Sequence, residues 1–472
     1  MAESDASTSL LDRTWRRVRG VWQDIATSAL GVIGSESGLR PELPDSDLAR
    51  LRERMQACLE ARGGEVSARA RAAGLGRTYL GLDRAGRVRF LKLLASEFDI
   101  DHERLAVVAG RLGASTGGEE RRTAERLLRR IAEPPRARLL TQFNALPEGV
   151  KFLVDLRAEL IDFAKDEPAL AGLEEDLKGL LAAWFDIGFL ELRRITWDSP
   201  AALLEKLSVY EAVHAVRSWV DLKNRLDSDR RCFAFFHPRM PSEPLIFVEV
   251  ALVKGLAGNI ATLLDAQAPV GDPRQADTAI FYSISNAQRG LVGISFGGFL
   301  IKRVVDQLSA EFPQLKAFAT LSPVPGFRAW FDARIAAGEA EPTAAERKAL
   351  AKALKVDASP PLKQLLADPK WPKDGARTTA LAKPLLRLMA KYLLEAKRED
   401  GAARDPVAHF HLSNGARVER LNWLADASAR GLRQSLGMMV NYRYDLADIE
   451  ANHEAYAGEG RVTAAAAVNS LV

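Results

Sequence analysis

Apolar side chains recur at helical spacing through residues 1–190. Four such stripes begin at Leu48, Val88, Phe152 and Leu173, and the apolar positions of each return after three or four residues. This spacing places them on one face of a helix. No run with strand-like alternation interrupts the region. The pattern therefore predicts a helical bundle, in which the apolar faces pack against one another.

The pattern changes after residue 190. Four runs rich in Phe, Ile and Val predict strands. They lie at residues 232–236, 245–252, 278–285 and 316–321. A helical pattern at 297–308 separates the last two, which makes a strand–loop–helix–strand unit. We therefore expect an α+β or α/β second half, with a ligand site in a loop that follows a strand.

A helical insertion is expected at about 342–403. Thr343 and Glu346 at its start have the spacing of a capping box, in which each side chain accepts a hydrogen bond from the backbone of the other residue. Beyond the insertion, residues 407–412 and 418–425 have a strand-like pattern and are predicted as strands.

Composition excludes several classes of protein. The chain has 472 residues, 47% of them hydrophobic and 27% charged, as in a soluble protein with a well-formed core. The formal net charge is only +4, which gives no reason to expect nucleic acid as a partner. No apolar stretch approaches the roughly 20 residues of a membrane span, so no membrane partner is expected.

Cysteine and histidine usage bears on metals and on location. Cys58 and Cys232 are too few for a disulfide framework or a Cys-rich zinc site. The six histidines form no HExxH or HxxxH pair, so we expect no metal. Four arginines between positions 13 and 19 resemble a transit peptide, but three acidic residues among the first twelve argue against one. The expected location is the cytoplasm.

Residues 293–297 read Gly-Ile-Ser-Phe-Gly, a match to the G-x-S-x-G nucleophile elbow. An elbow needs a strand that runs straight into the serine, whereas residues 286–292 separate Ser295 from the predicted strand. The same glycines would let a pyrophosphate approach backbone N–H groups at a helix N-terminus, with Arg289 and Lys302 nearby. A diphosphate site for a nucleotide or coenzyme A and a tight turn that only packs the helix both remain open.

Two further features could carry chemistry. His409 and His411 lie two apart in the predicted strand 407–412, which would point both imidazoles to one face. Such a pair suits proton transfer, although it is also compatible with no catalytic role. Ser322 ends the strand 316–321 and begins a rigid Ser-Pro-Val-Pro-Gly turn, at a strand end where ligand sites tend to lie.

Seven ordered blocks mark residues 195–444. They are Phe-His-Pro at 236–238 with Pro-Ser-Glu-Pro-Leu at 241–245, Phe-Tyr-Ser-Ile-Ser at 281–285, Gly-Phe-Leu-Ile-Lys-Arg-Val-Val at 298–305, Leu-Ser-Pro-Val-Pro-Gly-Phe at 321–327, Phe-His-Leu at 410–412, Asn-Trp at 422–423 and Asn-Tyr-Arg-Tyr at 441–444. Together these blocks resemble the malonyl-CoA decarboxylase family. The helical first part is compatible with the family but contains no signature block.

The resemblance implies an α+β protein of two domains. Residues 1–190 would form a helical N-terminal domain for oligomerisation and support. Residues 191–472 would form a catalytic domain of the GCN5-related N-acetyltransferase (GNAT) fold, with the helical insertion at about 342–403. The implied reaction converts malonyl-CoA to acetyl-CoA and CO2 through an enolate, without a metal or an organic cofactor.

The resemblance also assigns the site. Ser322 and His411 match the catalytic serine and histidine of the family. The loop that binds malonyl-CoA matches Val292, Gly293, Ile294, Ser295, Phe296, Gly297 and Gly298. Ser295 stands where some relatives carry an acidic residue, so a carboxylate has no assigned role in this loop. Ser283 and Tyr444 are further candidates for orienting the malonyl group.

These residue types fit the reaction. Loss of CO2 from a malonyl thioester leaves an enolate, and a donor such as Ser322 stabilises the charge that develops on its oxygen. The carbanion must then be protonated at carbon. His411, with the ordinary imidazole pKa of about 6.5, suits the general acid.

Other classes of function stay open on the residues alone. A serine thioesterase would use Ser295 with His409 or His411. A coenzyme A-binding module, or an N-acetyltransferase with an amine acceptor, would use the glycine-rich loop without decarboxylation. Leftover apolar surface on the helical faces of residues 1–190 predicts a homodimer or homotetramer.

Overall fold

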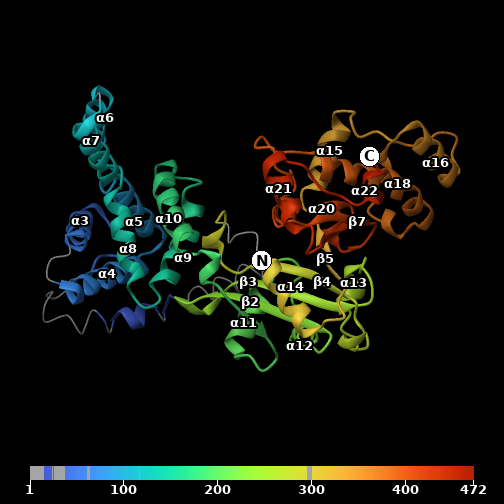
Figure 1. Cartoon of the computed structure of the whole chain (residues 1–472), viewed down its shortest axis with the longest axis horizontal. Coiled ribbons are helices and arrows are strands. Elements are labelled where there is room, and N and C mark those ends of the chain that lie inside the picture. The colour runs from blue at the N-terminus through green and yellow to red at the C-terminus, as the bar shows by residue number, and fades with distance from the viewer. Residues whose placement is uncertain are drawn as a thin grey trace. The chain divides into compact units, whose positions relative to one another are not determined.

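The computed structural model describes residues 15–16, 18–23, 25, 38–60, 64–115, 117–294 and 300–472. These residues form an α+β protein with helices throughout the N-terminal part and a sheet farther along the chain (Figure 1). The fold class is confirmed at this level. Contacts divide the chain into two compact units. The first comprises Met1–Glu191, Phe235–Ile246 and Asn286–Phe296, and the second comprises Leu192–Ala234, Phe247–Ser285 and Gly297–Val472.

Helices build the first unit, as the apolar stripes predict. They are α3 (Asp45–Leu59), α4 (Gly64–Gly81), α5 (Arg84–Glu97), α6 (His102–Ala114), α7 (Gly118–Ile131), α8 (Pro135–Asn144), α9 (Gly149–Phe163) and α10 (Ala171–Trp184), with 3-10 turns at Pro168–Leu170, Ile187–Phe189 and Arg289–Leu291. Asp83 and Asp101 cap α5 and α6 with their side chains, which fixes where these helices begin. Helix α9 is buried along most of its length and packs against α8 and α10.

An eight-stranded sheet runs through the second half of the chain. Its strands are β1 (Glu191–Ile195), β2 (Arg230–His237), β3 (Met240–Val253), β4 (Thr278–Asn286), β5 (Ala317–Thr320), β6 (Ser322–Pro323), β7 (Arg417–Asn422) and β8 (Met439–Tyr444). Their order is β1-β2-β3-β4-β5-β8-β6, with β7 also paired to β8. The predicted strands at 232–236, 245–252, 278–285, 316–321 and 418–425 are confirmed to within a few residues.

The pairing of β4, β5 and β8 matters most for the site. Strands β4 and β5 are parallel and pair from Thr278 with Ala317 to Phe281 with Thr320. Strand β8 runs antiparallel to β5 and then to β6, where Ser322 pairs with Val440. The carboxyl ends of β4 and β5 therefore lie at the same edge of the sheet, where ligands of parallel sheets bind.

Helices fill the rest of the second unit. They are α11 (Ala201–Tyr210), α12 (Trp219–Arg225), α13 (Ile260–Leu263), α14 (Leu300–Glu311), α15 (Phe327–Ala336), α16 (Ala344–Leu354), α17 (Leu362–Leu365), α18 (Gly375–Glu395), α19 (Pro406–Ser413), α20 (Ala429–Ser435), α21 (Ile449–Glu459) and α22 (Ala466–Asn469), with 3-10 turns at Pro273–Gln275 and Trp371–Lys373. The capping box of Thr343 and Glu346 is present at the start of α16. In the described part of the chain, no helix is long and apolar enough to cross a membrane.

The predicted strand at 407–412 is wrong, because these residues form helix α19. Pro406 occupies the first turn, where its fixed φ suits a helix. The side chain of Asp405 caps the helix by accepting from the N–H groups of Val407 and Ala408. The cap outweighs the strand propensity of Val407 and Phe410. His409 and His411 consequently point to different sides of a helix, not to one face of a strand.

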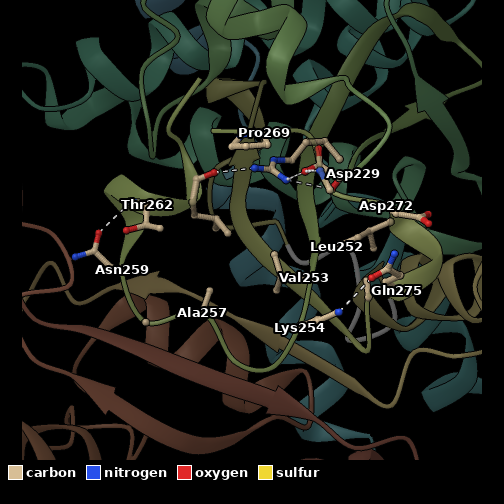
Figure 2. A pocket seen from close by; sticks show the side chains of 15 residues that line it. Asp229, Leu252, Val253, Lys254, Ala257, Asn259, Thr262, Pro269, Asp272 and Gln275 are labelled. Carbon is tan, nitrogen blue, oxygen red and sulfur yellow. Dashed lines mark hydrogen bonds and ion pairs between the residues drawn. The ribbon is translucent and has the colours of Figure 1, made fainter. Parts of the chain in front are cut away.

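A cavity of about 590 Å³ lies in the second unit beside the end of β3 (Figure 2). Several of its polar groups bind one another or nearby backbone. The guanidinium of Arg230 binds the carboxylate of Asp229 and the carbonyl oxygen of Leu263. The ammonium of Lys254 donates to Gln275. No residue of the Ser322–His411 pair lines this cavity.

Candidate active site

Ser322, His411 and Tyr444 form a continuous hydrogen-bonded chain in the second unit. The hydroxyl oxygen of Ser322 lies 3.0 Å from Nε2 of His411, and Nδ1 of His411 lies 2.8 Å from the hydroxyl of Tyr444. The three residues are only 6%, 3% and 2% exposed, respectively. The fold thus brings together three residues singled out from the sequence. Tyr444, which was expected to orient the malonyl group, instead contacts His411.

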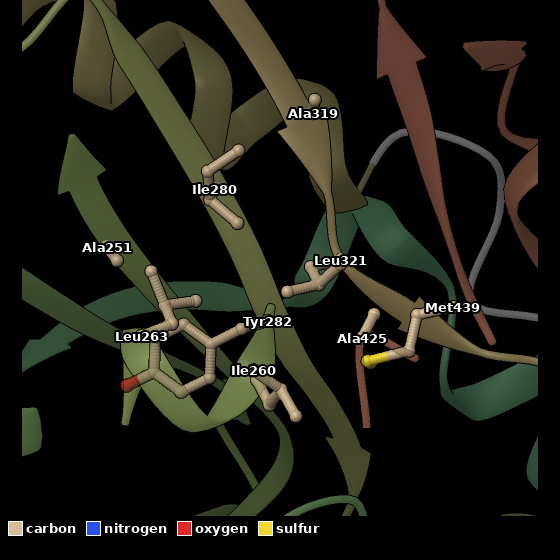
Figure 3. Packing of buried hydrophobic residues seen from close by; sticks show 9 residues of the cluster. All are labelled: Ala251, Ile260, Leu263, Ile280, Tyr282, Ala319, Leu321, Ala425 and Met439. Atoms are coloured by element: carbon tan, nitrogen blue, oxygen red, sulfur yellow. The ribbon is translucent and has the colours of Figure 1, made fainter. Parts of the chain in front are cut away.

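The sheet register explains why these side chains meet. Residues two apart on a strand point to the same face, so Thr320 and Ser322 share a face. Strand β8 lies alongside in antiparallel register, with Tyr444 opposite Phe318 and therefore on that same face. Leu321 lies between the two hydroxyl residues and points the other way, into an apolar cluster with Ile280 (Figure 3).

Thr320 belongs to the site, although no motif in the sequence marks it. The hydroxyl of Ser322 donates to Oγ1 of Thr320 over 2.8 Å, and this oxygen also accepts from the backbone N–H of Tyr442. The amide of Asn441 donates to the carbonyl oxygen of Thr320. The available signal was the strand period, since Thr320 lies two residues before Ser322 in a predicted strand.

Burial governs the charge of the site. Desolvation lowers the pKa of His411 to about 3, because no charged group among the described residues compensates. Burial raises the pKa of Tyr444 well above its ordinary value. The imidazole is therefore neutral at neutral pH and stacks on the ring of Tyr442, with ring centroids 4.6 Å apart. The expected ordinary pKa of about 6.5 for His411 is wrong for this state of the protein.

A neutral imidazole has one donor and one acceptor nitrogen, and the neighbours decide which is which. Ser322 donates its hydroxyl hydrogen to Thr320, so its oxygen accepts from Nε2–H of His411. Nδ1 then accepts from the hydroxyl of Tyr444, which stays protonated. This series of hydrogen bonds thus orients one lone pair of the Ser322 oxygen and fixes the tautomer of His411.

Ser283 lies on the same face of the sheet but is bound elsewhere. Phe281 pairs with Thr320, and Ser283 follows Phe281 at the strand period. The hydroxyl of Ser283 donates to both carboxylate oxygens of Glu211, over 2.8 and 2.7 Å. Ser285 donates to the same carboxylate over 3.1 Å. Glu211, a second residue that no sequence motif marks, binds both serines at the carboxyl end of β4.

The glycine-rich loop is described only in part. Val292, Gly293 and Ile294 belong to the first unit, whereas Ser295, Phe296, Gly297 and Gly298 lie outside the described residues. Gly293 has a φ of +75°, in the left-handed region that favours glycine. The guanidinium of Arg157 donates to the carbonyl oxygens of Gly290 and Val292, over 2.6 and 2.9 Å. The start of the loop is therefore fixed on α9.

His409 has a separate environment. Its Nδ1 lies 2.8 Å from the hydroxyl of Tyr456 on α21, and partial burial lowers its pKa. Of the two histidines, His411 is the one that contacts Ser322. As for metals, the described residues hold no group of three or more His, Cys, Asp or Glu side chains that could bind an ion.

A buried serine–histidine–tyrosine chain at the carboxyl end of a parallel strand is an arrangement typical of enzymes. The family models specify which enzymes. The model for the malonyl-CoA decarboxylase C-terminal domain matches residues 188–472, and that for the N-terminal domain matches residues 98–185. The chain belongs to the malonyl-CoA decarboxylase family of enzymes.

Individual relatives agree with the family models. The chain is 40% identical over 422 residues to "Malonyl-CoA decarboxylase, mitochondrial" of Anser anser anser, which covers 86% of this chain and 84% of that protein. It is 37% identical over 464 residues to the protein of the same name from Rattus norvegicus. This match covers 94% of this chain and 92% of the rat protein.

Solved structures of the family are also similar. The malonyl-CoA decarboxylase of Rhodopseudomonas palustris matches with a TM-score of 0.81 and 42% identity, covering 90% of this chain and 99% of that one. The enzyme of Agrobacterium vitis matches with a TM-score of 0.80 and 41% identity, covering 89% and 99%.

Proposed function

We propose that the protein converts malonyl-CoA to acetyl-CoA and CO2, with Ser322 and His411 as its catalytic residues. The observation that carries this proposal is the buried 3.0 Å contact between the Ser322 oxygen and Nε2 of His411. Both residues lie within residues 188–472, which match the family model. Ser322 follows the carboxyl end of β5, where a substrate of a parallel sheet can bind. Family membership supplies the substrate class.

The proposed first step breaks the bond between the carboxylate carbon and the methylene carbon. CO2 leaves, and the electron pair moves onto the thioester to give an enolate oxyanion. Hydrogen-bond donors aimed in advance at this oxygen lower the barrier. Ser322 fits this role, because its hydroxyl can turn from Thr320 to the developing charge while Nε2–H of His411 continues to support its oxygen.

The second step places a proton on the methylene carbon, and we propose that His411 donates it. In the free protein this imidazole is neutral, since burial lowers its pKa to about 3. A bound malonyl group brings a carboxylate, and a nearby opposite charge raises the pKa of an imidazole. His411 would therefore take up a proton together with the substrate and pass it to the carbanion. Overall, malonyl-CoA and one proton give acetyl-CoA and CO2.

Substrate contacts are proposed for the remaining site residues. Backbone N–H groups of the loop 292–298 would bind the coenzyme A diphosphate, and the fixed start of that loop at Gly290 and Val292 supports this. Tyr444 would act through Nδ1 of His411. Ser283 would have to exchange the carboxylate of Glu211 for that of the malonyl group before it could donate to the substrate.

The domain assignments also belong to the proposal. We propose a helical domain at 1–190, a GNAT-like catalytic domain at 191–472 and a helical insertion at about 342–403. The first domain would support a homodimer or homotetramer. The hairpin of α6 and α7 favours this, because both helices are largely exposed and Val107 presents an apolar side chain to water. Light scattering at the monomer mass, at micromolar concentration, would contradict the assembly.

Cofactor requirement and location are proposed as well. We expect full activity after exhaustive treatment with a metal chelator, because the thioester itself accepts the electron pair. The cytoplasm stays the predicted location, although the goose and rat relatives are named as mitochondrial. Fractionation of cells that express the full chain, followed by immunodetection, would test it.

One assay tests the proposed function against its alternatives. The purified protein is incubated with malonyl-CoA, and the thioester product is identified by mass spectrometry. Acetyl-CoA is expected. Free coenzyme A with malonate would instead indicate a thioesterase, and no turnover would indicate a binding module or an acetyltransferase.

The serines provide matched variants for this assay. Ser322→Ala should lower turnover strongly, because it removes the proposed donor to the enolate. Ser295→Ala should weaken only the binding of coenzyme A. An inactive Ser295→Ala together with an active Ser322→Ala would favour the nucleophile-elbow interpretation of residues 293–297.

A further inference from the structure

Asp405 connects the segment that carries Ser322 to the helix that carries His411. It precedes α19, it is only 1% exposed, and each of its carboxylate oxygens has its own set of partners. We propose that Asp405 is a positioning residue, which holds these two segments at the separation that the Ser322–His411 contact requires. This inference rests on the proposed function of that pair.

One oxygen of the carboxylate fixes the helix. Oδ1 of Asp405 accepts from the backbone N–H of Val407 over 3.0 Å and from that of Ala408 over 3.1 Å. An N-cap of this kind determines the residue at which a helix begins. It thereby determines the rotational phase of the helix, and with it the direction in which His411 points.

The other oxygen holds the turn that follows Ser322. Oδ2 of Asp405 accepts from the backbone N–H of Gly326 over 3.1 Å, and the hydroxyl of Tyr392 donates to it over 3.4 Å. Gly326 ends the segment 322–326, which begins with strand β6, contains two prolines and is therefore stiff. A displacement at Gly326 would be passed along this segment to Ser322.

Close packing at Gly326 supports the same conclusion. A Cβ added to Gly326 would lie 2.2 Å from the hydroxyl oxygen of Tyr392 and 3.3 Å from Oδ2 of Asp405. Only glycine allows the backbone to come this near to the two side chains. The close approach of the turn to the start of α19 thus depends on two residues. Gly326 leaves room for it on the turn, and the buried carboxylate of Asp405 holds it from the helix.

The reason for such a connection lies in sequence separation. Ser322 and His411 are 89 residues apart, and their contact is a single side-chain hydrogen bond. The hydrogen bond from the backbone N–H of Gly326 to the carboxylate of Asp405 joins the same two segments across 79 residues. Catalytic groups must be held within about 0.5 Å of their working geometry. A misplacement of about 1 Å can lower a rate roughly 100-fold.

The two oxygens can be tested separately. Asp405→Asn keeps an oxygen that can cap α19, because asparagine is as good an N-cap as aspartate. Its amide NH2 would then face the N–H of Gly326, so two donors oppose each other and the connection is lost. Asp101→Asn is the matched control. Asp101 is exposed and caps α6 by accepting a hydrogen bond from the N–H of Arg104.

We expect Asp405→Asn to lower kcat for malonyl-CoA about 10- to 100-fold while KM changes less than about threefold. Asp101→Asn should change neither. In the free protein, the ring 15N resonances of His411 should shift in Asp405→Asn, because the bonds to Ser322 and Tyr444 are altered. Should Asp405→Asn fail to fold, Asp405→Ser takes its place, since serine also caps the helix and has no second oxygen.

Three results would overturn the proposal. They are an unchanged kcat in a folded Asp405 variant, an equal loss in Asp101→Asn, and unshifted ring resonances of His411. Failure of the proposed function is recognised separately. In that case the unmodified protein makes no acetyl-CoA, whereas the resonances of His411 still report on its position.

Discussion

Acidification gives a direct test of the buried state of His411. In the unfolded chain its imidazole takes up a proton below about pH 6.5, whereas in the fold burial lowers its pKa to about 3. Between these values the unfolded state binds more protons. The free energy of unfolding therefore falls as the pH falls. From linkage, this residue alone should remove about 2 kcal/mol by pH 5 and about 5 kcal/mol below pH 3.

The measurement is urea unfolding of the full chain at several pH values between about 7.5 and 5. His411→Asn cannot titrate, so its free energy of unfolding should fall less steeply, by about 2 kcal/mol over this interval. His214, whose pKa burial lowers to about 4, is present in both proteins and cancels in the comparison. The same substitution at the exposed His102 serves as control. If the free energies of unfolding of the unmodified protein and of His411→Asn fell equally with pH, a neutral, buried His411 would be refuted.

Three further predictions concern turnover and packing. His411→Asn should retain malonyl-CoA binding and lose about 10²- to 10⁴-fold in turnover, whereas His409→Asn should lose much less. Steady-state kinetics that show the reverse order would contradict the assigned proton donor. Thr320→Val should lower kcat about tenfold, because Ser322 loses its acceptor and can rotate, and a direct rate assay checks this. Gly290→Ala should lower the melting temperature by several degrees, because its Cβ would lie 1.7 Å from a backbone oxygen of α9. Gly179→Ala is the control, because its Cβ would lie in open space and should not lower the melting temperature.

Local patterns were sufficient for most of the fold. The strands around Phe235, Phe247 and Ile280 were predicted because buried strands of a sheet read as continuous apolar runs. The capping box at Thr343 was predicted because its two residues lie within one turn. Residues 407–412 were assigned wrongly, because their side chains favour a strand while Asp405 and Pro406, just before them, begin a helix.

The candidate site was predictable only where family motifs marked it. Ser322, His411 and Tyr444 could be named from their blocks, but their mutual contacts join residues far apart in the chain. Glu211 gave no signal, since it lies in an irregular segment between two helices and reaches β4 only in the folded chain. Tertiary contacts of this kind leave no local periodicity.

Burial of His411 is likewise a property of the whole fold, and it changes the chemistry that the sequence suggested. A histidine in a short motif is expected to be half-protonated near pH 6.5, ready to act as an acid. The hydrogen-bond partners of the imidazole, Ser322 and Tyr444, are both neutral, so neither offsets the desolvation of its charged form. The proton for the carbanion must then arrive with the negative charge of the substrate. Such coupling would supply the acid only when a malonyl group is bound, so that the cation forms only where a negative charge accompanies it.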